Sequence, residues 1–132
     1  MRMTKDQMRN AAMQVADNIF ESHRAEGNRF YVYKDHYYIR LDSWDGWLVD
    51  LSNHSQVMED LEYDGRIRSP WTKYKALISE RLLHRARSIA QPIDTSGVSW
   101  EDVVNPHYDE RTNIESFVNA CDTRNRIPMK GN

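Results

Sequence analysis

The spacing of apolar residues changes abruptly at Gly27, and this change constrains the fold more than any other feature of the chain. Thr4 is followed three places later by Gln7, which is a capping-box pattern, and apolar residues then recur at helical spacing as far as Gly27. Beyond Gly27 they alternate with a period of two. The sequence therefore predicts an amphipathic helix over residues 5–25, followed by β structure.

Two turn signals divide the alternating region into three strands. Lys34-Asp35-His36 is expected to form the first turn, and the segment 43–46 the second. The residues expected to face the helices are Phe30, Val32, Ile39, Leu41, Val49 and Leu51. The prediction is a three-stranded antiparallel meander.

The second half of the chain is predicted to be mostly helical. A short helix is expected over residues 55–61, and Ser69-Pro70 is a typical start for a long helix that stops before Pro92. The apolar stripe of this long helix consists of Trp71, Tyr74, Ile78, Leu82, Ala86 and Ile89. A short turn over 99–104 and a last helix from Asp109 or Thr112 to Ala120 or Cys121 complete the pattern.

These elements predict an α+β domain. At 132 residues, the chain is long enough for one compact core. We expect the two long helices, and with them the mostly helical second half, to pack on one face of the sheet. A single globular domain is predicted over residues 1–121, with a loose C-terminal tail over 122–132.

Several classes of protein are disfavoured. No apolar run approaches the roughly 20 residues that cross a bilayer, and the N-terminal residues lack the apolar region of a signal peptide. The lone Cys121 fits neither a disulfide nor a zinc site, which favours a cytoplasmic protein. No glycine-rich phosphate loop, nucleophile elbow or Cys-x-x-Cys pair is present. We therefore expect no enzyme, no cofactor and no membrane partner.

One carboxylate cluster could hold Mg²⁺ or Mn²⁺ and support hydrolysis. It consists of Asp42, Asp45 and Asp50, with His54 following. However, strand alternation directs Asp42 and Asp50 away from the apolar face, into solvent. A metal-dependent hydrolase is therefore the third hypothesis, and no metal site is assigned.

The other face of the predicted sheet is the first candidate binding surface. Tyr31, Tyr33, Tyr38 and Arg40 would lie there together, away from the helices. Tyrosine and arginine are over-represented among residues that anchor protein interfaces. Tyrosine also has a high strand propensity, so the same pattern is compatible with an ordinary solvent-facing sheet.

A reversal of charge along the chain gives the second candidate surface. Residues 35–64 contain eight carboxylates against Arg40 alone, and residues 66–87 contain seven cations against Glu80. The candidate binding cations of the second stretch are Arg66, Arg68, Lys73 and Arg87. Either the two stretches neutralise one another, or the basic stretch binds an anionic partner.

The order of helix, three antiparallel strands and basic helix resembles that of double-stranded-RNA-binding domains. The likeness spans roughly residues 4–90, with Lys73 and Lys75 near the start of the second long helix. The resemblance implies that this helix start contacts phosphates. The sequence departs from the family in lacking its lysine-rich signature and in carrying an acidic stretch before the helix.

The favoured hypothesis is a small non-enzymatic module that binds another protein through Tyr, Trp and Arg surfaces. Its short, polar, aromatic-rich sequence is similar in general character to accessory or inhibitor proteins of phages and mobile elements that act on host machinery. The alternative is a nucleic-acid-binding protein that uses residues 66–87, with Trp71 and Tyr74 as stacking groups. A homo-oligomer is compatible with either hypothesis. If neither surface binds, the acidic segment 42–64 could engage a basic partner.

Overall fold

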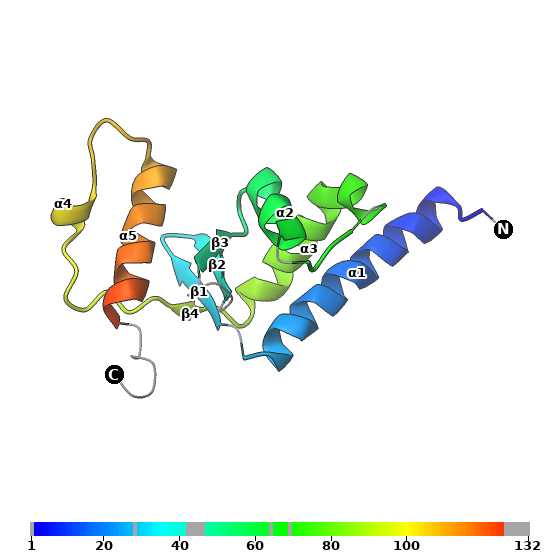
Figure 1. Cartoon of the computed structure of the whole chain (residues 1–132), viewed down its shortest axis with the longest axis horizontal. Helices are drawn as coiled ribbons and strands as arrows, with labels where there is room; N and C mark the ends of the chain where they lie inside the picture. The colour runs from blue at the N-terminus through cyan, green and yellow to red at the C-terminus, as the bar shows by residue number, and fades with distance from the viewer. Residues whose placement is uncertain (1, 28, 42–46, 64, 69, 126–132) are drawn as a thin grey trace.

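The computed structural model describes residues 2–27, 29–41, 47–63, 65–68 and 70–125 (Figure 1). In chain order the elements are α1 (Lys5–Ala25), β1 (Arg29–Tyr33), β2 (His36–Leu41), β3 (Trp47–Asp50), α2 (His54–Tyr63), the 3-10 helix η2 (Trp71–Tyr74), α3 (Lys75–Arg87), β4 (Gln91–Pro92), α4 (Trp100–Val103) and α5 (Glu110–Asn125). This arrangement confirms the predicted α+β class.

Helix α1 has the predicted bounds, and its ends show why. The Thr4 hydroxyl accepts a hydrogen bond from the Gln7 amide (3.1 Å), and the Gln7 side chain accepts one from the Thr4 amide (2.8 Å). At the other end Gly27 takes a positive φ of 80°, which a residue with a side chain rarely adopts. Local chemistry therefore determines both ends of the helix.

The sheet contains the predicted meander and one further strand, in the order β3-β2-β1-β4. Strands β1, β2 and β3 are antiparallel, and β4 pairs in parallel with β1 beside Tyr31 and Val32. Lys34 and Asp35 both have positive φ, as a two-residue hairpin turn requires. The predicted second turn, 43–46, lies outside the described residues.

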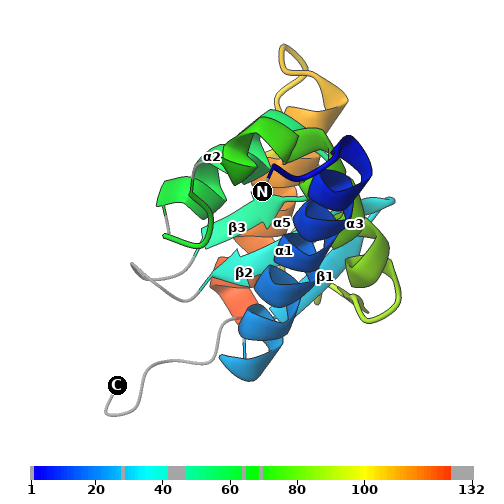
Figure 2. The ribbon, with the colours of Figure 1, turned by 90° about the vertical axis from the view of Figure 1, so that its right-hand side faces the viewer.

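Helices α1 and α3 lie side by side and cover one face of the sheet, with α2 beside them (Figures 1 and 2). The predicted stripe of α3 is confirmed, because Ile78, Leu82 and Ala86 are fully buried in the core beneath. The predicted long helix begins as a 3-10 turn, η2, and becomes α-helical at Lys75.

Helix α5 covers the opposite face, so the prediction that the whole second half packs on one face is wrong (Figure 1). Its buried residues Ile114, Phe117, Val118 and Cys121 recur at helical spacing and form a second core with Tyr38 of β2. The sheet is therefore enclosed between two helical layers. Helix α5 also continues beyond the expected end, to Asn125, and residues 126–132 of the expected tail lie outside the description.

Candidate functional site

The tyrosine face of the sheet forms a second core with α5. Tyr38 is fully buried and Arg40 is 8% exposed, because α5 packs over both. The Arg40 guanidinium Nε lies 3.1 Å from Asp122 Oδ2 on α5. The expectation that these two residues face solvent is therefore wrong. The physical reason is that α5 buries its apolar stripe by packing against this face of the sheet.

Tyr31 and Tyr33 belong to the same layer, where both are half-buried. The Tyr33 ring lies 5.1 Å from that of Phe117 and 6.4 Å from that of Trp100. These offset ring contacts are typical of a packed aromatic cluster. Lys34 covers the outer side, with its ammonium 4.1 Å from the centre of the Trp100 ring.

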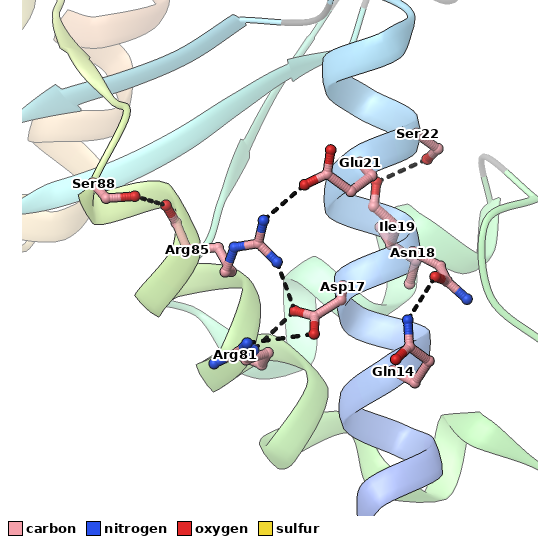
Figure 3. A network of polar contacts seen from close by, with 9 residues as sticks. All are labelled: Gln14, Asp17, Asn18, Ile19, Glu21, Ser22, Arg81, Arg85 and Ser88. Atoms are coloured by element: carbon pink, nitrogen blue, oxygen red, sulfur yellow. Dashed lines mark hydrogen bonds and ion pairs between the residues drawn. The ribbon is translucent and has the colours of Figure 1, made fainter.

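Three arginines of the basic stretch are engaged by α1. Arg66 donates two hydrogen bonds to the Glu26 carboxylate (2.5 and 2.6 Å). Arg81 and Arg85 converge on Asp17, at 2.8 and 2.9 Å (Figure 3). Their guanidinium groups lower the pKa of Asp17. In these three cases the carboxylate lies on α1 or at its C-cap, Glu26, and not in the acidic stretch 35–64.

Arg68, Lys73 and Arg87 are exposed. Helical spacing from Trp71 predicts that Lys73 and Arg87 point away from the apolar stripe and that Arg81 and Arg85 flank it. The structure confirms this contrast, since Lys73 and Arg87 lie in solvent whereas Arg81 and Arg85 are partly packed. Lys73 and Arg87 nevertheless do not form one patch, because fourteen residues of helix separate them by about 20 Å. The Arg87 guanidinium instead lies over the Tyr37 ring, 5.7 Å from its centre.

Six of the described cations that form no ion pair with a described residue lie toward one end of the molecule. Helices α1 and α3 run parallel, as the pairs of Asp17 with Arg81 and Glu21 with Arg85 show, and η2 packs against α1. The same offset of 64 residues brings Arg9 level with Lys73. We call this end the basic end, and its exposed members are Arg2, Lys5, Arg9, Arg68, Lys73 and Lys75.

None of these six cations forms an ion pair with another described residue. Asp6 is the one carboxylate within segments 2–9 and 68–75. The N-terminal ends of α1 and α3 both point toward this end of the molecule and add the positive ends of their dipoles to it. Sequence reasoning missed the contribution of α1, although the helical spacing of Lys5 and Arg9 was a signal for a basic face.

Two aromatic rings lie beside the basic end. Trp71 and Tyr74 are half-exposed, and their ring centres are 6.0 Å apart. Both also pack against the first core. The two rings thus lie beside Lys73 and Lys75, as the sequence predicts. One part of each ring packs against the protein, and the other part is exposed to solvent.

A second charged feature, the acidic pocket, lies between α2, β3 and α5 and has a volume of about 330 Å³. Its polar lining consists of Asp50, Asn53, Gln56, Asp60, Glu115 and Asn119. Asp50 is 3% exposed, so the expectation that it points into solvent is wrong. It lies on the sheet face that α5 covers, opposite Tyr38 in the β2–β3 register.

No metal centre forms from the described residues. Within them, no three His, Cys, Asp or Glu side chains come together in a way that could hold a metal ion. Asp42 and Asp45 of the sequence-based metal hypothesis lie outside the description, and His54 begins α2. Cys121 is buried, and its burial raises the pKa of the thiol, which disfavours a reactive thiolate.

Among the described helices, none combines the length and the apolar character needed to cross a membrane. No protein-family model, curated protein or solved structure matches the chain. The candidate functional sites are therefore the two charged features, the basic end and the acidic pocket.

Proposed function

We propose that the protein binds the phosphate backbone of nucleic acid with its basic end. The observation that carries this proposal is that segments 2–9 and 68–75 bring six exposed cations to one region. None of the six forms an ion pair with a described residue. Phosphate contacts from lysine and arginine supply most of the affinity in sequence-independent binding. Net charge does not oppose this function, because the formal charge of −2 is unevenly distributed.

The internal ion pairs support the proposal by holding the basic end together. Asp17 and Glu21 bind Arg81 and Arg85 of α3 (Figure 3), which fixes α3 parallel to α1. The 64-residue offset of these pairs puts Lys73 level with Arg9 along the two helices. The half-exposed rings of Trp71 and Tyr74 add surfaces on which a base or sugar could stack. Duplex RNA is the first probe to use, because the order of elements resembles that of double-stranded-RNA-binding domains.

The proposal predicts that the affinity for nucleic acid falls steeply with salt concentration, and that this dependence comes from the basic end. Each phosphate contact contributes about −0.9 to the slope of log K against log salt on a duplex, so six contacts give a slope of about −5. We expect fluorescence anisotropy with a labelled RNA duplex to show such a slope. Arg9→Glu with Lys73→Glu should weaken binding more than tenfold, since two attractive contacts become repulsive.

The matched control is Arg24→Glu with Arg87→Glu, two exposed arginines at the other ends of α1 and α3. This variant makes the same change in net charge, and we expect it to weaken binding less than about threefold at physiological salt, where the Debye length is about 8 Å. Equal losses in the two variants would refute a localised site. A wild-type slope near zero, or no binding to duplex or single-stranded RNA and DNA, would refute the function.

The protein-binding hypothesis retains support, but from a different surface. The tyrosine face that favoured it is closed by α5. The surface that could bind a protein partner is the acidic pocket, whose carboxylates would attract a basic segment.

A further inference from the structure

The acidic pocket contains a buried carboxylate with an unused acceptor. Asp50 Oδ1 accepts a hydrogen bond from the Ser52 amide (2.8 Å), but Oδ2 is buried and has no hydrogen-bond partner among the described residues. The nearest cation is the half-exposed Arg111, whose Nε is 3.9 Å away and beyond hydrogen-bond distance. A buried carboxylate oxygen without a donor is unfavourable, so this oxygen favours a ligand that donates.

A second polar atom without a partner lies on the same face. The Tyr38 hydroxyl is fully buried, and no residue in the described part of the chain forms a hydrogen bond with it. Tyr38 is the residue directly opposite Asp50 across β2 and β3. Two buried polar groups on adjacent strands are thus left unsatisfied next to one pocket, which is uncommon in native proteins.

The rim of the pocket adds further negative charge. Asp60 of α2 accepts a hydrogen bond from Gln56 (3.0 Å), and Glu115 of α5 lines the facing wall. Burial, together with repulsion from neighbouring carboxylates, raises the pKa of both groups. A cation bound between them would relieve this repulsion.

The lining suits an organic cation better than a metal ion. The described carboxylates do not converge as metal ligands do, and amide side chains of Asn53, Gln56 and Asn119 lie between them. An arginine guanidinium carries five N–H donors in a planar fork, so it can reach several separated oxygens at once. A volume of about 330 Å³ is sufficient for such a side chain.

The strand beside the pocket offers backbone groups to the same partner. Strand β3 is at the edge of the sheet. The Leu51 amide donates to the Tyr37 carbonyl (2.8 Å), so alternation along β3 directs the N–H and C=O of Leu48 outward, away from β2. An extended segment could pair with these groups and place alternate side chains at the pocket.

We propose that the acidic pocket binds an arginine side chain of an extended, basic segment of a partner protein. The arginine donates to Asp50 Oδ2 and lies between Asp60 and Glu115. This site is separate from the basic end, so it stands or falls independently of nucleic-acid binding.

The test uses a labelled, extended peptide with arginine at alternate positions, and the same peptide with neutral citrulline in place of each arginine. We expect titration calorimetry to show that citrulline weakens binding at least tenfold. Asp60→Asn with Glu115→Gln should weaken the arginine peptide to a similar extent, because both changes remove rim charge without altering side-chain shape. Asp50→Asn keeps the Ser52 contact and should also weaken binding.

The matched control is Glu80→Gln with Glu101→Gln, which removes two exposed carboxylates outside the pocket. We expect less than a twofold change from it, and also from Lys73→Glu at the basic end. Equal weakening by control and pocket variants would show diffuse attraction and overturn the site. Equal binding of the citrulline peptide, or absence of arginine-peptide binding to the folded protein, would overturn it as well.

Discussion

The buried pair of Arg40 and Asp122 provides the sharpest test of the second helical layer, because strand alternation and the structure predict opposite results. Alternation alone puts Arg40 in solvent, where a substitution changes the free energy of unfolding by at most about 0.5 kcal/mol. In the structure the two side chains are only 10% and 7% exposed, with Nε and Oδ2 3.1 Å apart. The pair therefore belongs to the class of buried ion pairs.

We expect Arg40→Met and Asp122→Leu each to lower the free energy of unfolding by about 3–5 kcal/mol. Each change removes this ion pair and leaves the other charge buried, whereas loss of an exposed pair costs only about 0–1 kcal/mol. The double variant should recover most of this loss, because apolar side chains of similar volume replace buried ion pairs at little net cost.

Urea unfolding followed by circular dichroism measures these changes. With an m-value of about 2 kcal/mol per molar, a loss of about 4 kcal/mol lowers the midpoint by about 2 M. The matched control is Arg68→Met, an exposed arginine, which should move the midpoint by at most about 0.25 M.

Two outcomes would refute this reasoning. If Arg40→Met moved the midpoint no further than Arg68→Met, α5 would not seal the sheet, and the tyrosine face would again be a candidate binding surface. If the double variant lost as much stability as the two single variants together, Arg40 and Asp122 would contribute separately and not as a pair.

Other perturbations test the two cores and the titrating groups. Leu82→Ala in the first core and Phe117→Ala in the second should each lower the free energy of unfolding by about 2–5 kcal/mol in urea titrations, because each side chain is at most 3% exposed. A negligible effect of either substitution would contradict the placement of that residue in its core. The pKa of Asp17 is lowered, so its contribution to stability is present above the ordinary carboxyl value of 3.8 and disappears as pH falls through the lower pKa of the folded state. The difference in free energy of unfolding between wild type and Asp17→Asn should therefore narrow as pH falls through that range. A constant difference would argue against the arginine contacts. Asp60 and Glu115 have raised pKa values, so their effect of pH on stability is opposite to that of Asp17. The folded state binds more protons than the unfolded state, so the free energy of unfolding falls as pH rises above the ordinary values of 3.8 for Asp60 and 4.5 for Glu115. As pH rises through these values, the free energy of unfolding of the variant Asp60→Asn with Glu115→Gln should increase relative to that of wild type. This relative gain should be absent if the two carboxyl groups are fully hydrated.

The sequence by itself determined the elements whose causes are local. The capping box of Thr4 and Gln7 and the positive φ at Gly27 set the ends of α1, so its bounds were predictable. The helical phase of α3 was also readable, since apolar spacing alone separates buried Leu82 from exposed Lys73. Interactions within a few residues are sufficient for such features.

The candidate sites were only partly predictable, because charged residues acquire their roles from distant partners. The sequence indicated that Arg81 and Arg85 would be partly packed, but not that Asp17 of α1 would bind both. It likewise singled out Lys73 as exposed, but not Arg9 as its neighbour. Periodicity gives the face of a helix on which a residue lies, and it contains no information on what lies opposite that face.

The tertiary structure alone decided which sheet face each helix covers. The apolar stripe of α5, from Ile114 to Cys121, shows that the helix must be buried, yet both faces of the meander could accept it. Because α1 and α3 occupy the first face, α5 covers the second, and Tyr38, Arg40 and Asp50 change from solvent-facing residues into buried ones. The same packing of α1 parallel to α3 assembles the basic end from two segments, 2–9 and 68–75, that are far apart in the sequence. Burial of apolar area drives such packing, because it lowers the free energy wherever the chain can bring apolar side chains together.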